Sequence, residues 1–201
     1  MMNLRSKAWA SHFILLILLL SISAPAAHSG ITPPAAGTQL PQLILPAPEN
    51  AEHRRYLRLN GGESFQVSQI KSSVVIIEIY SLYCPHCQNE APLLNDLYQA
   101  IEQDERLKGT IKIIGLGIGN SPFEVDVYRK TYNVPFPLFP DNEFVIHKSL
   151  GEPRTPYFIA IKVSDDGSHK VIYSKLGSIK EVNGFLKMIA ELSGFERGGT
   201  K

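Results

Sequence analysis

Apolar residues follow two patterns along the chain from about residue 56 onward: nearly continuous runs, and positions that recur at helical spacing. The stretch VVIIEIY at 74–80 is a nearly continuous β-branched run, which predicts a central strand buried on both faces of a sheet. A second run of this kind, IKIIGL at 111–116, predicts another strand. Between the two runs, apolar residues recur at helical spacing and predict a helix, at Leu93, Leu94, Leu97, Tyr98 and Ile101.

The second half of the chain continues this alternation with clear start and stop signals. Ser121, Pro122 and Glu124 predict a helix start, because serine can cap, proline suits the first turn and glutamate completes a capping box. The proline-rich stretch VPFPLFPD at 134–141 predicts a loop or an edge segment. The remaining expected elements are a short helix at 142–150, a hairpin of strands at 157–163 and 170–176, and an amphipathic helix at 182–192 closed by Gly194.

The order of these elements is β-α-β-α, a short helix, then β-β-α. The early alternation implies a parallel pair of strands with a right-handed crossover, and the late hairpin adds antiparallel strands. The sequence therefore predicts an α/β fold with a central mixed sheet flanked by helices.

Residues 1–29 carry the pattern of a secretory signal peptide. Arg5 and Lys7 supply positive charge, FILLILLL at 13–20 is a short apolar run, and small residues follow it. The run is too short to span a bilayer comfortably, which takes about 20 residues. We expect export to the periplasm or another extracytoplasmic space, with cleavage after Ala26 or Ser29; an uncleaved N-terminal membrane anchor is the alternative. Oxidising compartments of this kind permit stable disulfides.

Residues 30–55 follow as a proline-rich stretch, which we interpret as an extended spacer. Its leucines and isoleucine at 43–45 could pack on the domain or on a partner, and packing on the domain is the favoured interpretation. The regular pattern then covers residues 56–194, the expected single domain. Residues 195–201 form a polar, glycine-containing end that we expect to be disordered.

Composition narrows the choice of function. The 201 residues carry a formal net charge of +1, and such a balance gives no sign of the basic face that nucleic-acid binding usually requires. The apolar content is normal for a globular protein, so the core can form without cross-links. We expect a monomer that does not bind nucleic acid.

The sequence has two cysteines, Cys84 and Cys87, which form the motif CPHC. A disulfide across so short a loop would add only about 2 kcal/mol of stability, a poor reason to keep one in a chain of this size. Zinc usually needs four ligands, and the sequence offers no second cysteine pair and no spaced histidine pair. We therefore expect no metal and favour redox chemistry.

The placement of the pair supports that interpretation. A C-x-x-C motif that follows a central strand and opens a helix puts its first cysteine where unpaired N–H groups and the helix dipole point. Both favour the thiolate, which is the attacking species. Cys84 is the expected nucleophile and Cys87, one turn further on, the resolving thiol. The pair itself would be the redox group, so we expect no dissociable cofactor.

With these residues the chain resembles the thioredoxin fold family over about 56–194. VVIIEIYSLYCPHC resembles the buried strand that leads into the family's redox motif, and Pro92 matches the proline in its active-site helix. Thr155 and Pro156 resemble the loop with a cis-proline, which implies contact with the bound substrate. Tyr83 stands where the family usually has tryptophan, and the resemblance implies substrate contact there too.

Two acidic residues join the expected site. Glu78 resembles the buried aspartate of thioredoxin that helps to move a proton from the second cysteine, and burial would raise its pKa. Glu90 belongs to CPHCQNEAP, which is similar to the C-x-x-C-x-x-E-x-P pattern of extracytoplasmic proteins of the TlpA/ResA type. The resemblance implies that it tunes the acidity of the cysteines. Exposure at the surface, near a sheet edge for Glu78 and on a helix for Glu90, is the alternative for each.

Pro85 and His86 match the dipeptide of the oxidant DsbA, in which a stabilised thiolate raises the reduction potential. The TlpA/ResA resemblance instead implies a reductase, associated with cytochrome c maturation and served by a membrane redox partner. We favour a reductase of protein disulfides, with a DsbA-like oxidant or a thioredoxin-like binding or assembly module as alternatives. A peroxidase is disfavoured, because peroxiredoxins place a threonine and a proline where this chain has Ser81 and Ile77.

Overall fold

The computed structural model describes residues 32–164 and 166–195. The expected signal peptide lies outside the described residues, as do residues 196–201 of the expected disordered end. Within the described part of the chain, no helix is long and apolar enough to cross a membrane.

A five-stranded mixed sheet forms the centre of the molecule, as the sequence predicts. Its central strand, β3, pairs in parallel with β4 and antiparallel with β6; β5 extends the sheet in parallel beyond β4, and β7 extends it antiparallel beyond β6. The order is therefore β5-β4-β3-β6-β7. The bounds are β3 Val74–Tyr80, β4 Ile111–Ile118, β5 Leu138–Asp141, β6 Tyr157–Val163 and β7 His169–Leu176.

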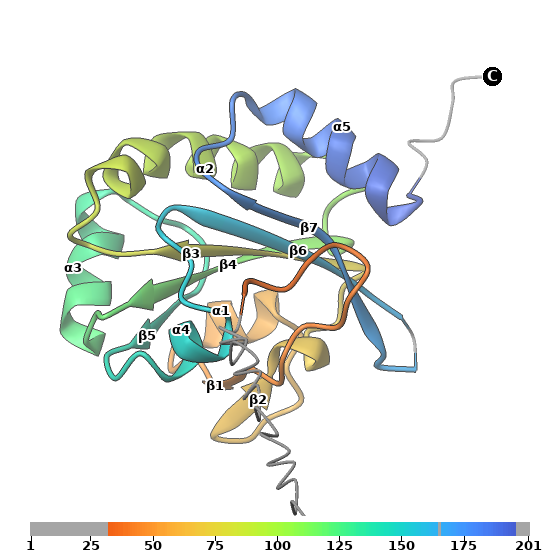
Figure 1. Ribbon diagram of the computed structural model, residues 1–201. Coiled ribbons are helices and arrows are strands. Elements are labelled where there is room, and N and C mark those ends of the chain that lie inside the picture. Colours follow the sequence, from red (N-terminus) through yellow and green to blue (C-terminus); the bar gives the residue numbers. More distant parts are fainter. Residues whose placement is uncertain (1–31, 165, 196–201) are drawn as a thin grey trace, which may run out of the picture.

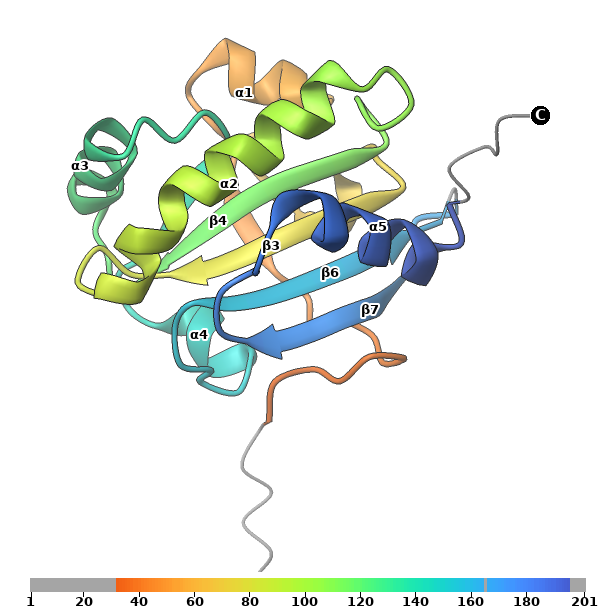
Figure 2. The ribbon, with the colours of Figure 1, turned by 90° about the horizontal axis from the view of Figure 1, so that it is seen from above.

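Two long helices, α2 (Pro85–Gln103) and α5 (Val182–Ser193), lie together across one face of this sheet. Figure 2 shows both of them over the strands, and Figure 1 shows them from the side. Helix α3 (Pro122–Thr131) packs beside β5 and begins with the predicted capping box of Ser121 and Glu124. The predicted helices and their order are thus confirmed.

The short helix expected at 142–150 spans only Val145–Ser149, as α4. The carboxylate of Asp141 accepts hydrogen bonds from the N–H groups of Ile146 and His147, at 3.0 and 2.8 Å. Phe144 precedes the helix in a left-handed conformation, with φ at +57°. The helix begins later than expected because Asp141, several residues earlier, satisfies its first N–H groups.

The two faces of β3 contribute to two different cores. Val74, Ile76 and Tyr80 belong to the cluster packed against α2 and α5. Val75, Ile77 and Ile79 belong to a second cluster on the opposite face. Strand alternation assigns successive residues to opposite faces.

The stretch at 30–55 was expected to be an extended spacer, but its described part, residues 32–55, is partly folded and packs on the domain. Leu43 and Leu45 are buried in the second core, which confirms that this stretch packs on the domain. The cause is local alternation: the two leucines point inward while Ile44, between them, stays exposed. The segment and its neighbours form β1 (Ile44–Pro46), α1 (Ala51–Tyr56), β2 (Ser64–Gln66) and the 3-10 turn η1 (Val67–Gln69).

Figure 1 shows the β1–β2 ribbon and α4 on the side of the sheet opposite α2 and α5. The same N-terminal segment also reaches the outer strand β7. The N–H of Gly37 donates to the carbonyl of Val171 at 2.8 Å, and the N–H of Val171 donates to the carbonyl of Thr38 at 2.8 Å. At the other edge, the segment expected to be a loop or edge forms strand β5, which contains Pro140.

Candidate active site

Both cysteines lie at one end of the sheet, where the carboxyl ends of the parallel strands lie, because the topology brings several chain segments there. Strands β3, β4 and β5 are parallel, so the loops that follow them emerge at the same end of the sheet. Strand β6 runs antiparallel to β3, so the segment before β6 lies at that end of the sheet as well. Loops outside the carboxyl ends of parallel strands are the usual place for sites in such sheets.

Cys84 is the N-cap of α2, and its sulfur accepts a hydrogen bond from the N–H of Cys87 at 3.4 Å. Partial burial alone would raise the pKa of Cys84. Hydrogen bonds to the sulfur from the Cys87 thiol, the Thr155 side chain and the backbone N–H groups of the first turn outweigh burial, so the pKa lies below its ordinary value. Cys84 is partly exposed and can meet another molecule.

Cys87 differs in each of these respects. Cys87 is fully buried in the core that lies between the sheet and helices α2 and α5. Burial, followed by the hydrogen bond that its thiol donates to Cys84, raises the pKa of Cys87 well above its ordinary value. The structure thus holds an accessible thiol with a lowered pKa beside a shielded thiol with a raised one.

Glu78 lies in the central strand with 1% of its surface exposed, so the alternative of an exposed residue near a sheet edge is wrong. Within residues 32–164 and 166–195, neither of its carboxyl oxygens has a hydrogen-bond partner. Burial raises the pKa of Glu78 well above its ordinary value, and the charges of Glu90 and Cys84 raise it further. The carboxyl group is therefore uncharged over a wider pH range than usual.

Glu90 is also buried, so the alternative of a solvated helix residue is wrong for it too. Its Oε1 accepts a hydrogen bond from the N–H of Ile179 at 2.8 Å. Ile179 belongs to the loop between β7 and α5, so this bond ties the active-site helix to that loop. Pro92 lies within the same helix and supplies no N–H to the carbonyl one turn earlier.

Thr155 and Pro156 face the cysteines, as the resemblance implies. Their peptide bond is cis. The Cys84 thiol donates to the carbonyl of Thr155 at 3.5 Å, so the segment before β6 lies against the nucleophile. Pro85 and His86 occupy the first turn of α2 and are exposed.

Tyr83 is 67% exposed beside Cys84. Its hydroxyl donates to a carboxylate oxygen of Glu124, the residue that completes the capping box of α3. Burial is therefore not what holds this aromatic ring in place; a hydrogen bond to the neighbouring helix does.

Sequence reasoning missed two residues that position the site. Asn120 is fully buried, and its side-chain oxygen accepts from the N–H of Leu82 at 2.8 Å, which holds the loop before Cys84. Tyr128 of α3 donates from its hydroxyl to the carbonyl of Cys87 at 2.8 Å. The available signal for Asn120 was a polar residue two positions after the buried strand β4. For Tyr128, which shares one face of a helix with other apolar residues, no such signal exists.

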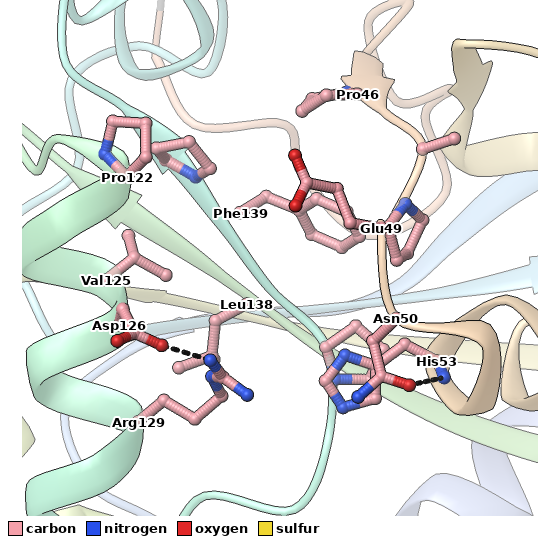
Figure 3. A pocket seen from close by; sticks show the side chains of 14 residues that line it. Pro46, Glu49, Asn50, His53, Pro122, Val125, Asp126, Arg129, Leu138 and Phe139 are labelled. Atoms are coloured by element: carbon pink, nitrogen blue, oxygen red, sulfur yellow. Dashed lines mark hydrogen bonds and ion pairs between the residues drawn. The ribbon is translucent and has the colours of Figure 1, made fainter.

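Two cavities lie near these elements. A groove of about 420 Å³ runs beside Cys84 and is lined by Tyr83, Phe144 and Thr155 among others. A larger pocket of about 590 Å³ lies between the N-terminal segment and α3. Figure 3 shows Asp126 and Arg129 on one side of it and Asn50 and His53 on the other.

The larger pocket lacks the chemistry of the cysteine site. Arg129 is already paired with Asp126 across one turn of α3. Burial, followed by the positive charge of Arg129, lowers the pKa of His53. Neither cysteine lines this pocket. In the described part of the chain, no group of three or more histidine, cysteine or acidic side chains is placed to hold a metal ion.

Solved structures with a similar architecture include two whose descriptions name thiol–disulfide chemistry. The thioredoxin domain of a thiol-disulfide oxidoreductase from Bacteroides vulgatus has a TM-score of 0.57 at 15% identity, covering 77% of this chain and 98% of that one. A putative thiol:disulfide interchange protein DsbE from Chlorobium tepidum has a TM-score of 0.58 at 14% identity, covering 80% and 99%. This likeness confirms the thioredoxin-like fold.

Sequence comparison agrees with the fold. The thiol-disulfide oxidoreductase ResA of Geobacillus thermodenitrificans (strain NG80-2) is 20% identical over 147 residues, which are 71% of this chain and 75% of the relative. The model of the AhpC/TSA family matches residues 36–171. Because that match spans well over half of the sequence, the chain belongs to the AhpC/TSA family.

Proposed function

We propose that the protein is a thiol–disulfide oxidoreductase that reduces disulfides in other proteins outside the cytoplasm. The observation that carries this proposal is the contrast between the two thiols. The accessible Cys84 has a lowered pKa at the start of α2, and the buried Cys87, in contact with it, has a raised one. Thiolate character and access are what make a cysteine a nucleophile in disulfide exchange.

The reaction proceeds in two exchanges. The Cys84 thiolate attacks one sulfur of a substrate disulfide, forms a mixed disulfide and releases the other substrate sulfur as a thiolate. Cys87 then loses its proton and attacks the sulfur of Cys84, which frees the second substrate thiolate. Two electrons pass from the cysteine pair to the substrate, the pair ends as a disulfide, and the released thiolates take up protons. A dithiol donor must then reduce the pair again.

Glu78 is the proposed proton carrier for the second exchange. Its buried carboxyl interacts electrostatically with the Cys87 thiol, and the pKa values of both groups are raised. A carboxyl with a raised pKa is better matched to a thiol, so a proton can pass between them at lower cost. Glu90 acts by holding α2 against the loop at Ile179.

The reducing direction is supported by the resemblance of CPHCQNEAP to the TlpA/ResA pattern, whose glutamate, Glu90, is buried here. The opposite direction, a DsbA-like oxidant, is favoured by Pro85 and His86 in the first turn. Equilibration of the pair with glutathione or dithiothreitol buffers separates the two. We expect a reduction potential near about −270 mV, whereas a value near about −120 mV would contradict the reducing direction.

Export to the periplasm or a similar space is supported by the charged, apolar and small-residue order at 1–29. A structure described as that of a secreted disulfide oxidoreductase of Mycobacterium tuberculosis matches with a TM-score of 0.50 at 18% identity, covering 65% of this chain and 90% of that one. A role in cytochrome c maturation, a membrane redox partner that supplies electrons, and a monomeric state complete the proposal. The cysteine pair carries the electrons, and no separate cofactor takes part.

The decisive experiment is a trap. In a Cys87→Ala variant the mixed disulfide on Cys84 cannot be resolved, so disulfide-containing peptides should accumulate on Cys84 and be found by intact mass spectrometry. The matched Cys84→Ala variant should accumulate none. Adducts on Cys84→Ala instead, or on neither variant, would contradict the proposed function.

A further inference from the structure

The groove beside Cys84 has an aromatic wall that the redox chemistry itself does not use. Tyr83 forms one side, with 67% of its surface exposed, and Phe144 forms another, with 43% exposed. The rim adjoins Thr155, whose carbonyl accepts from the Cys84 thiol. The groove therefore adjoins the position at which a substrate disulfide would meet Cys84.

Phe144 is held in this position against its own backbone preference. Its φ of +57° is in the left-handed region, which is unfavourable for a bulky side chain. The N–H of Phe144 donates to the carbonyl of Asp141 at 3.1 Å, while the carboxylate of Asp141 caps α4 just beyond. The surrounding structure thus over-determines a strained residue, a condition typical of binding and active sites.

The surface beneath the ring is shaped to receive it. Gly119 follows β4, and a Cβ atom there would lie 2.6 Å from Cζ of Phe144, too close for any side chain. Because Gly119 has no side chain, the phenyl ring lies directly against the backbone at the floor of the groove. The His147 ring lies near the phenyl ring in a tilted arrangement, with centroids 5.9 Å apart.

Arg154 and His147 are the basic side chains that line the groove, and the Glu124 carboxylate that is bonded to the Tyr83 hydroxyl is not part of that lining. Arg154 is exposed, lines the groove and forms no ion pair within the described residues. His147 is the other side chain there that can carry a positive charge, and none of the described residues lining the groove is acidic. An acidic group on a bound chain would complement this charge.

We propose that this groove is a specificity subsite for the substrate polypeptide, in which Phe144 and Tyr83 hold an aliphatic or aromatic side chain next to the substrate's reactive cysteine, and Arg154 pairs with an acidic residue beyond it. The subsite rests on the proposed function, since it selects among substrates of that same reaction. Phe144 and Arg154 are specificity-determining residues that take no part in electron transfer.

Competition between peptides on the trapping variant tests the subsite. Two peptides that share the same disulfide, one with leucine and one with serine beside the cysteine, are mixed in equal amounts with reduced Cys87→Ala protein. Intact mass spectrometry gives the ratio of the two adducts on Cys84. We expect the leucine peptide to be favoured about tenfold, the effect of burying one aliphatic side chain.

Adding Phe144→Asn should reduce that ratio to about twofold or less, because asparagine tolerates a positive φ but lacks the apolar ring. Phe144→Tyr keeps the ring and should preserve the ratio. The matched control is Phe123→Ala, which removes an exposed aromatic ring outside the groove and should also preserve it. Equal adducts of both peptides, or the same loss in Phe123→Ala, would overturn the subsite while the proposed function stands.

A second pair of peptides, with glutamate or lysine beyond the leucine, tests the charge. The glutamate peptide should be favoured about threefold at low salt, and Arg154→Glu should reverse the preference. Retention of the preference in Arg154→Glu overturns the charge pairing. Failure of every peptide to form an adduct on Cys84 overturns the proposed function, and the subsite with it.

Discussion

The two faces of strand β3 bury different kinds of side chain. One face presents Val75, Ile77 and Ile79 to a core of apolar side chains that is closed by the N-terminal segment. The other places Glu78 and Tyr80 in a core that also holds Cys87. The carboxyl group of Glu78 and the hydroxyl of Tyr80 have no hydrogen-bond partner among the described residues.

This difference separates stability from chemistry. Buried polar groups without partners lower stability, and they persist where they have a function. The face that carries Val75, Ile77 and Ile79 contributes to stability by burying apolar side chains. The two faces should therefore respond differently to substitution.

The largest effect is expected on the apolar face. Leu45→Ala removes a fully buried side chain from the second core and should lower the free energy of unfolding by about 3 kcal/mol in urea titrations. The alkylation rate of Cys84 should stay as in the wild type, because Leu45 packs on the other side of the sheet. Ile44→Ala, on the same strand but 57% exposed, should change stability by less than about 1 kcal/mol. Slower alkylation of Cys84 in Leu45→Ala would contradict the separation of stability on one face of β3 from chemistry on the other.

The next effect concerns Glu78 and depends on pH. The folded protein raises the pKa of Glu78 above the ordinary value of 4.5, so its contribution favours folding most below that pH. As pH rises towards the folded pKa, the contribution is lost, with a slope of at most about 1.4 kcal/mol per pH unit. Glu78→Gln removes this titration, so between pH 5 and 8 its stability should fall less steeply than that of the wild type. Parallel stability curves would contradict the assignment.

The smallest effect sharpens the comparison within the chemical face. Tyr128→Phe removes the hydroxyl that donates to the carbonyl of Cys87 and should lower stability by about 1 kcal/mol. It should also change the reduction potential of the cysteine pair, because the first turn of α2 loses a support. Tyr132→Phe, at the C-cap of the same helix, is the control and should leave the potential as it is. An unchanged potential in Tyr128→Phe would limit this residue to packing.

Local signals made much of this molecule predictable. The β-branched run before Cys84, the capping box at Ser121 and the helix opening at the CPHC motif all depend on neighbours within a few residues. The cis peptide bond before Pro156 was expected from a resemblance, and the structure has it. The short-range pattern thus predicted the sheet, the main helices and the pairing of strands.

Features that depend on distant partners could not be predicted in the same way. Glu90 is buried because it accepts from Ile179, a residue far along the chain, and nothing near Glu90 announces that loop. Phe144 forms a groove wall because Asp141 caps a helix across an intervening turn and Gly119 leaves space beneath the ring. The proline content of residues 30–55 suggested a spacer, whereas two inward leucines decide that the stretch joins the core.

The N-terminal segment has one more consequence, at the rim of the sheet. A strand at the end of a sheet offers unpaired N–H and C=O groups to any other chain, which is a route to aggregation. Gly37 and Thr38 occupy those groups at Val171 in the outer strand β7, and Pro140 interrupts the donor pattern in β5 at the opposite rim. By pairing part of one outer strand and leaving the other short, the fold hinders edge-to-edge association between copies.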